Sequence, residues 1–152
     1  YWQDTVFLIV ADHDARASGV DLVPIKNFHI PGIILNGKQE HFADNRLVSQ
    51  IDLAPTLLSL IGIKNTSPML GHDLNNANSG GRAMMQYADN FAYIKGENVS
   101  ILQPQKEALN FKYNFNHKVL SSKKDNDNLS EIALAHALWG SFAYKNEWFN
   151  VK

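Results

Sequence analysis

Four side chains that could carry chemistry lie close together near the start of the chain. Asp12, His13, Asp14 and Arg16 follow directly after "VFLIVA", an unbroken apolar run over residues 6–11. Carboxylate and imidazole groups are ligands for Zn²⁺ or Mn²⁺, and Mg²⁺ or Ca²⁺ also fits where carboxylates dominate. Asp12 and His13 are therefore candidate ligands of a divalent metal ion. A polar turn at the end of a strand uses the same residue types, so spacing alone leaves both interpretations open.

Arg16 lies four residues after Asp12 and carries a planar guanidinium. Such a group can bind phosphate or sulfate through two parallel hydrogen bonds, which makes Arg16 a candidate substrate-binding residue. A salt bridge to Asp14 or Asp21 is the alternative. A structural or exposed role is expected for His29. His41 and His72 fall in predicted loops, and His136 falls on the apolar stripe of the predicted C-terminal helix, where a core-edge position is expected.

The elements that must position these residues follow from the apolar pattern. Residues 5–11 predict a strand covered on both faces of a parallel or mixed sheet, because the apolar run does not alternate. Residues 30–37 predict a second strand that ends in a turn at Asn36-Gly37. Residues 5–11 and 31–35 are expected to be neighbouring strands of one sheet. In open α/β sheets, ligands bind beyond the carboxyl ends of strands. The end of the first strand would thus hold the Asp12–His13 pair in a fixed position.

Residues 49–63 predict a helix at about 52–61, which Ser49 or Asp52 could cap and Gly62 could end. The helical spacing is that of Leu53, Leu57, Leu60 and Ile61. Residues 65–81 are rich in turn-forming residues and predict a long loop.

The second half of the chain has a different pattern of apolar residues. Short β-branched and aromatic segments over residues 83–115 predict a small antiparallel sheet. Residues 121–128 read as a polar hinge, and Ser130 is expected to open a helix over 131–147. The predicted class is α/β, with residues 1–152 as a single partial domain. Residues 1–81 would carry the metal pair, and residues 82–152 the small sheet and terminal helix.

Composition narrows the classes of function. The chain has 152 residues, 45% of them hydrophobic, and a net charge of −1, which does not favour nucleic acid as a partner. It contains no cysteine, so no disulfide framework is expected. The apolar run is far shorter than the roughly 20 residues that span a bilayer. The chain starts at Tyr1 without an initiator Met, and we expect a mature product or a fragment.

Four segments occur in the order found near the C-terminal end of enzymes of the sulfatase and alkaline phosphatase superfamily. They are "VFLIVADHDAR" (6–16), "HIPGIIL" (29–35), "SQIDLAPTLLSLIGI" (49–63) and "MLGHDL" (69–74). The chain most resembles the membrane-anchored bacterial branch that includes lipoteichoic acid synthase and other phosphoglycerol transferases. The resemblance covers residues 5–75 and is carried mainly by the Asp-His pair together with the Asp-x-x-Pro-Thr-Leu-Leu helix. Asp14 departs from it, since many relatives have Gly after the pair.

The resemblance implies the C-terminal portion of an alkaline phosphatase-like α/β sandwich, with a small antiparallel sheet and a terminal helix. It implies that Asp12 and His13 bind a divalent metal ion (Mn, Mg, Ca or Zn). It further implies that an upstream acid and nucleophile complete the site, and that phosphate or sulfate esters react through a covalent enzyme intermediate. No nucleophile motif is found in this chain, so we expect the isolated fragment to be inactive.

The resemblance also implies that the full-length protein works in the cell envelope, with membrane contact only through upstream segments. The isolated fragment could associate with itself through an unpaired apolar edge. Two alternatives remain at this point: a binding or assembly module that keeps the fold without the metal, and a complete small α/β protein that shares only the strand and helix pattern.

Overall fold

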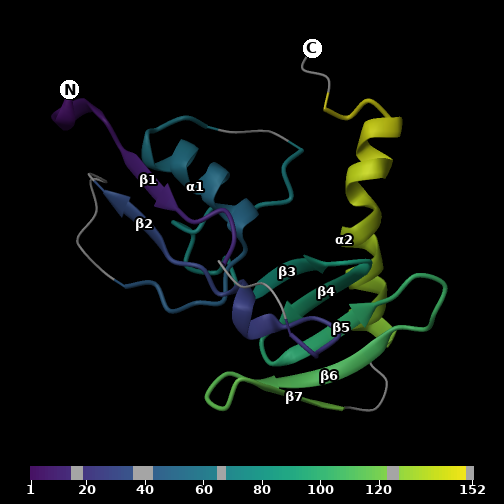
Figure 1. Ribbon diagram of the computed structural model, residues 1–152. Helices are drawn as coiled ribbons and strands as arrows, with labels where there is room; N and C mark the ends of the chain where they lie inside the picture. Colours follow the sequence, from purple (N-terminus) through teal and green to yellow (C-terminus); the bar gives the residue numbers. More distant parts are fainter. Residues whose placement is uncertain (15–18, 36–42, 65–67, 123–126, 150–152) are drawn as a thin grey trace.

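The structure is a computed structural model, and it describes residues 1–14, 19–35, 43–64, 68–122 and 127–149. Its described strands form a two-stranded sheet, β1–β2, and a five-stranded sheet in which β3 to β7 follow one another in sequence order. Figure 1 shows β1, β2 and the helix α1 grouped in one part of the molecule, with the larger sheet and the helix α2 in the other. This is the mixed α/β arrangement, with a small antiparallel sheet and a terminal helix, that the sequence predicts.

The first two strands are neighbours, as predicted. After a short 3₁₀ helix, η1 (Trp2–Asp4), β1 (Phe7–Val10) pairs antiparallel with β2 (Gly32–Leu35), and Ile9 lies opposite Ile33. Ile9 is 56% exposed and Ile33 is 53% exposed. The prediction of a strand covered on both faces of a parallel or mixed sheet is therefore wrong for this chain, in which the described sheet of β1 is an antiparallel pair. An apolar run indicates that a strand needs cover, but it does not say which residues supply it.

The helix predicted at residues 52–61 is confirmed. A 3₁₀ turn, η3 (Gln50–Asp52), leads into α1 (Leu53–Leu60), and Ser49 and Asp52 form a capping box at its start. Pro55 lies in the first turn, where the missing N–H costs no helical hydrogen bond. Gly62 follows the helix with a φ of +83°, the left-handed conformation in which glycine commonly ends helices.

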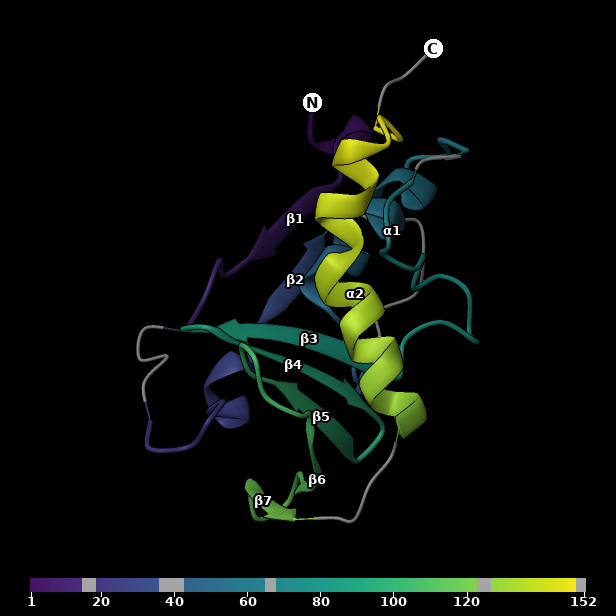
Figure 2. The same ribbon diagram turned by 90° about the vertical axis from the view of Figure 1, so that its right-hand side faces the viewer.

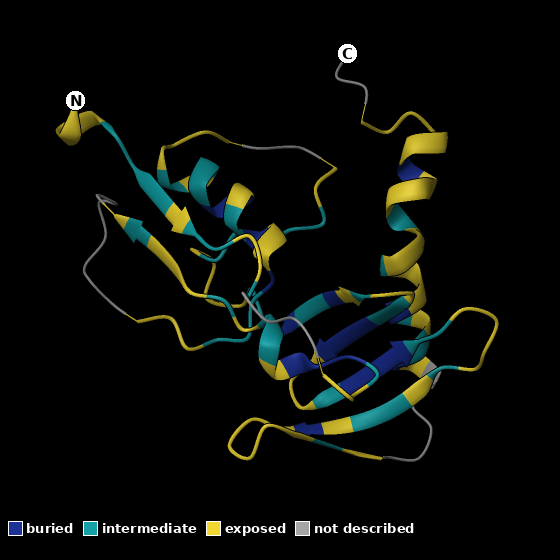
Figure 3. Cartoon of the chain, viewed as in Figure 1, coloured by how far each residue is buried: buried dark blue, intermediate teal, exposed yellow. Residues whose placement is uncertain are grey.

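The larger sheet has two buried faces. Its strands are β3 (Arg82–Tyr87), β4 (Asn90–Lys95), β5 (Asn98–Leu102), β6 (Leu109–Asn114) and β7 (Val119–Ser122). Side chains alternate between the faces, so Ala92 and Ile94 join one core cluster and Tyr93 joins the other. The first cluster also receives Val23 and Ile25, from the segment that contains the 3₁₀ helix η2 (Ile25–Phe28). Figure 3 shows the burial concentrated in the central strands of this sheet.

The terminal helix α2 (Asp127–Lys145) covers the second face through contacts with β5 and β4, and Figure 2 shows it extending past the sheet. Leu129 and Ala133 pack against Tyr93 in the second cluster. The His136 ring lies 4.7 Å from the Tyr93 ring, centroid to centroid, so His136 is the core-edge histidine that the helical stripe predicts. Neither described helix is long and apolar enough to cross a bilayer.

Two boundaries differ from the prediction. The antiparallel sheet extends beyond residue 115 to β7, where Ser121 and Ser122 pair with Lys112 and Phe111. The hinge predicted at 121–128 is therefore partly strand, because polar residues are well tolerated on an edge strand. The helix begins at Asp127, before Ser130, and ends at Lys145. The Ser130 hydroxyl lies 3.1 Å from the Ser100 hydroxyl instead of capping the helix.

Candidate functional site

The turn after β1 carries the two predicted metal ligands. The Ala11 amide donates to the Pro31 carbonyl at 3.4 Å, continuing the β1–β2 pairing up to the residue before Asp12. The Asp12 carboxylate then accepts the His13 amide at 3.0 Å. Asp12 Oδ2 and His13 Nε2 lie 3.6 Å apart, and the two side chains are 90% and 72% exposed. The structure thus brings a carboxylate oxygen and an imidazole nitrogen together in a solvent-accessible turn at the end of a strand.

The orientation of the His13 ring leaves Nε2 directed toward Asp12. His13 Nδ1 lies 2.8 Å from the Asp14 carbonyl oxygen, which can accept a hydrogen bond only if Nδ1 carries the proton. This hydrogen bond, followed by the nearby Asp12 charge, raises the pKa of His13 above its ordinary value. In the neutral tautomer that Asp14 favours, Nε2 has a free lone pair. Metal-binding histidines commonly have their other ring nitrogen held in this way.

The pair has the geometry of two ligands but not of a complete site. Two ligands of a tetrahedral Zn²⁺ at about 2.0–2.1 Å from the ion lie about 3.3 Å from each other. The observed 3.6 Å between Asp12 Oδ2 and His13 Nε2 is close to this separation. Among the described residues, no group of three or more His, Cys, Asp or Glu side chains converges in a way that could hold a metal ion. The remaining ligands of such a site would have to lie outside the described residues.

Neither His29 nor His72 joins this pair. Arg16 lies outside the described residues, as does His41. His29 is exposed just before β2, in agreement with the expectation. His72 contributes its backbone amide to Asp52 Oδ1 at 2.7 Å, which is a structural role.

The helix that follows the pair in the sequence is anchored by a buried ion pair. Asp52 is fully buried, and its two carboxylate oxygens accept hydrogen bonds from the Arg82 guanidinium at 2.9 and 3.0 Å. The same carboxylate accepts the Ser49 amide at 2.8 Å. Sequence reasoning identified Asp52 as a possible helix cap. Its carboxylate belongs to the capping box of η3 but makes no capping hydrogen bond to α1, and sequence reasoning missed Arg82. A buried arginine needs a partner, yet nothing in the sequence around β3 shows that this arginine is buried.

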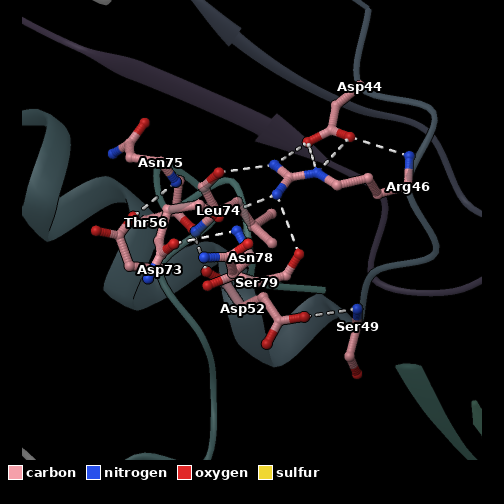
Figure 4. Close-up of polar contacts among 11 residues, drawn as sticks. Asp44, Arg46, Ser49, Asp52, Thr56, Asp73, Leu74, Asn75, Asn78 and Ser79 are labelled. Atoms are coloured by element: carbon pink, nitrogen blue, oxygen red, sulfur yellow. Dashed lines mark hydrogen bonds and ion pairs between the residues drawn. The ribbon is translucent and has the colours of Figure 1, made fainter. Parts of the chain in front are cut away.

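Thr56 and Arg46 hold the loop that follows α1. The Thr56 hydroxyl donates to the Asp52 carbonyl at 2.6 Å and accepts the Leu74 amide at 2.9 Å. Arg46 donates to the Leu74 carbonyl at 2.7 Å and to the carbonyls of Asn76 and Ser79. Figure 4 shows these contacts around the start of the helix. Through these two hydrogen bonds, Thr56 ties the start of the helix to the loop.

Asp44 completes the contacts of Arg46. Its carboxylate accepts hydrogen bonds from Arg46 Nε at 3.0 Å and from Nη2 at 2.6 Å. These hydrogen bonds lower the pKa of Asp44 below its ordinary value, against the opposing effect of partial burial. The guanidinium thereby links a carboxylate to three backbone carbonyls.

Comparison with known proteins agrees with this architecture. No family model matches the chain. A solved structure, that of a protein in the alkaline phosphatase superfamily from Vibrio parahaemolyticus, is 40% identical to this chain with a TM-score of 0.92. The match covers 100% of this chain and 38% of that chain, so the chain spans less than half the length of that protein. The mixed sheets and terminal helix correspond to the C-terminal part of an alkaline phosphatase-like fold. The shared fold and the sequence identity together support the alkaline phosphatase superfamily as the family of this chain.

Proposed function

We propose that this chain is the C-terminal part of a metal-dependent enzyme that hydrolyses or transfers phosphate or sulfate esters. The observation that carries the proposal is the arrangement of Asp12 and His13. A carboxylate and an imidazole stand together at the exit of a strand, and the Asp14 carbonyl leaves Nε2 of the imidazole available. The alkaline phosphatase superfamily relative supports an enzyme of the sulfatase or phosphoesterase type.

In this proposal, each residue of the turn has a distinct task. Asp12 supplies negative charge to the cation, and His13 supplies a neutral nitrogen ligand. A divalent ion bound there would polarise an ester oxygen and neutralise developing negative charge. Arg16 would bind the anionic group of the substrate, and the nucleophile would come from another part of the full-length protein.

The finer assignment within the superfamily is also a proposal. The Asp12-His13 pair, together with the segment Gln50–Leu58, resembles the branch of phosphoglycerol transferases that includes lipoteichoic acid synthase. The full-length protein would then act in the cell envelope, and an acceptor hydroxyl in place of water would make it a transferase.

The test is metal content and turnover of the full-length protein with Asp12→Ala or His13→Ala. Both variants are expected to lose bound metal and to reduce turnover of an aryl phosphodiester or aryl sulfate to background. Their melting temperatures in the presence of chelator should equal that of the wild type, because both side chains are largely exposed.

Glu131→Ala and His117→Ala are the matched controls. Glu131 is an exposed carboxylate on α2, and His117 is an exposed imidazole in the turn between β6 and β7. Both control variants should retain metal and activity. Wild-type metal content in Asp12→Ala and His13→Ala would refute the proposed site.

A further inference from the structure

One side chain links the helix motif to the candidate metal-binding turn. Gln50, the first residue of η3, donates a hydrogen bond from Nε2 to the Ala11 carbonyl at 3.1 Å. Ala11 is the residue between β1 and Asp12, and 39 positions separate it from Gln50. The contact therefore connects two motifs that the sequence shows only separately.

The Ala11 carbonyl belongs to the same planar peptide unit as the Asp12 amide. The plane is stiff, so fixing its oxygen fixes the direction in which the chain enters Asp12. On the other side of Ala11, its own amide is bonded to the Pro31 carbonyl. Ala11 is thus held by β2 through its N–H and by Gln50 through its C=O, immediately before the two predicted ligands.

Gln50 lies in a segment whose position is fixed by buried contacts. Its neighbour Ser49 donates its amide to Asp52, which is fully buried and paired with Arg82 of β3. The position of η3 is therefore tied to the five-stranded sheet. The Gln50 side chain extends from this fixed base to the turn.

We propose that Gln50 is a positioning residue that sets the orientation of the metal-binding turn through the Ala11 carbonyl. This inference rests on the proposed function of Asp12 and His13. In this role Gln50 would act through the backbone of the turn and not as a metal ligand. Residues that orient metal ligands without binding the metal typically change metal affinity by about 10–100-fold when they are replaced.

The test compares Gln50→Glu and Gln50→Leu in the full-length protein. The first variant keeps the shape but directs an oxygen at the Ala11 oxygen, and the second removes the donor. After metal removal, titration calorimetry with Mn²⁺ should show a Kd raised by about 10-fold or more in both variants. In the metal-free full-length protein, amide hydrogen exchange of the segment 7–14 should become faster in both variants. The melting temperature of the variants should equal that of the wild type.

Gln86→Glu is the matched control. Gln86 is exposed and donates from Nε2 to the Ala88 carbonyl at 2.8 Å, in the turn that joins β3 to β4. It repeats the type of contact that Gln50 makes, but away from the candidate site. This variant should leave the Kd for Mn²⁺ and the exchange of residues 7–14 unchanged.

The Asp12→Ala variant separates the two proposals. If Asp12→Ala weakens Mn²⁺ binding and the Gln50 variants do not, the role of Gln50 is refuted and the metal site stands. An equal loss of Mn²⁺ affinity in the control variant Gln86→Glu would also refute the role of Gln50. If Asp12→Ala binds Mn²⁺ like the wild type, the proposed metal site itself is wrong, and the role of Gln50 fails with it.

Discussion

At the scale of single residues, the strongest constraint is the buried contact between Asp52 and Arg82. Both side chains are almost completely removed from water, and their two hydrogen bonds have the bidentate geometry typical of strong arginine–carboxylate pairs. Such a pair adds little stability compared with apolar residues of similar size, but removing one partner leaves an uncompensated buried charge. The pair therefore specifies how η3 and β3 meet.

We predict that Asp52→Ala destabilises the protein by about 3–5 kcal/mol, because Arg82 would stay buried without a carboxylate. The Ser49 and His72 amides would also lose their acceptor. Urea unfolding measures the loss. Asp4→Ala, which removes an exposed carboxylate from η1, should change stability by about 0.5 kcal/mol or less.

A double variant tests the cause of this effect. Asp52→Ala combined with Arg82→Met should be less destabilised than the sum of the single changes, because it removes the orphaned charge. Strict additivity would show that the two side chains do not depend on each other in the way the structure indicates.

At the scale of elements, the loop after α1 is held by side chains of the helix and by close backbone approach. Thr56 accepts the Leu74 amide, and Arg46 donates to several carbonyls of the loop. Gly71 lies against η3 so closely that a Cβ atom would stand 2.0 Å from the Ile51 carbonyl oxygen. The glycine in "MLGHDL" thus has a physical explanation in the contact between loop and helix.

We predict that Gly71→Ala destabilises the protein by about 3 kcal/mol, at the upper end of the cost of overpacking, because the obstacle is backbone. Thermal unfolding monitored by circular dichroism measures the change. Gly140→Ala is the matched control. Apart from neighbouring residues and the helix's own backbone, no described atom lies within 4 Å of a Cβ built at Gly140 in α2. The stability of this variant should therefore rise by up to about 1 kcal/mol. A neutral Gly71→Ala variant would contradict the close contact.

At the scale of the whole molecule, the two sheets differ in how completely they are covered. The five-stranded sheet has cover on both faces, from α2 and from the segment around η2. The β1–β2 pair leaves the apolar face of Ile9 and Ile33 open. A two-stranded sheet is marginally stable by itself, so this pair is the part of the chain that most needs further partners.

We predict that the isolated chain associates with itself through the open face of β1–β2. Sedimentation velocity should show concentration-dependent oligomers. The double variant Ile9→Thr/Ile33→Thr should reduce them, because it keeps β-branched residues while removing apolar surface. Val119→Thr, at a 54% exposed position on β7, should not. A chain that stays monomeric at all concentrations would refute this association.

We also predict that the isolated chain is catalytically silent and binds metal poorly. A catalytic Zn²⁺ site usually takes three protein ligands, whereas the turn after β1 supplies Asp12 and His13 alone. Calorimetry with Mn²⁺ and Zn²⁺, alongside phosphodiesterase and sulfatase assays, provides the measurement. Micromolar binding at the pair, or turnover above background, would show that the chain holds a complete site.

The sequence by itself determined the elements and the location of the candidate site. The apolar run at residues 6–11 and the helical spacing from Leu53 to Ile61 are local patterns, and local patterns specify strands and helices. The order of the motifs also indicated the superfamily that the structural relative supports. Side-chain types at the end of the first strand were enough to identify Asp12 and His13 as candidate ligands, whose metal binding is still a prediction.

Only the tertiary structure decided which distant residues meet. Arg82 is 30 positions from its partner Asp52, and Gln50 is 39 positions from the Ala11 carbonyl that it holds. Neither contact has a periodic or local signature, because both depend on how the sheet, the helix and the loop pack together. The open face of β1 was also beyond prediction, since an apolar strand shows a need for burial while the packing of the whole molecule decides whether that need is met.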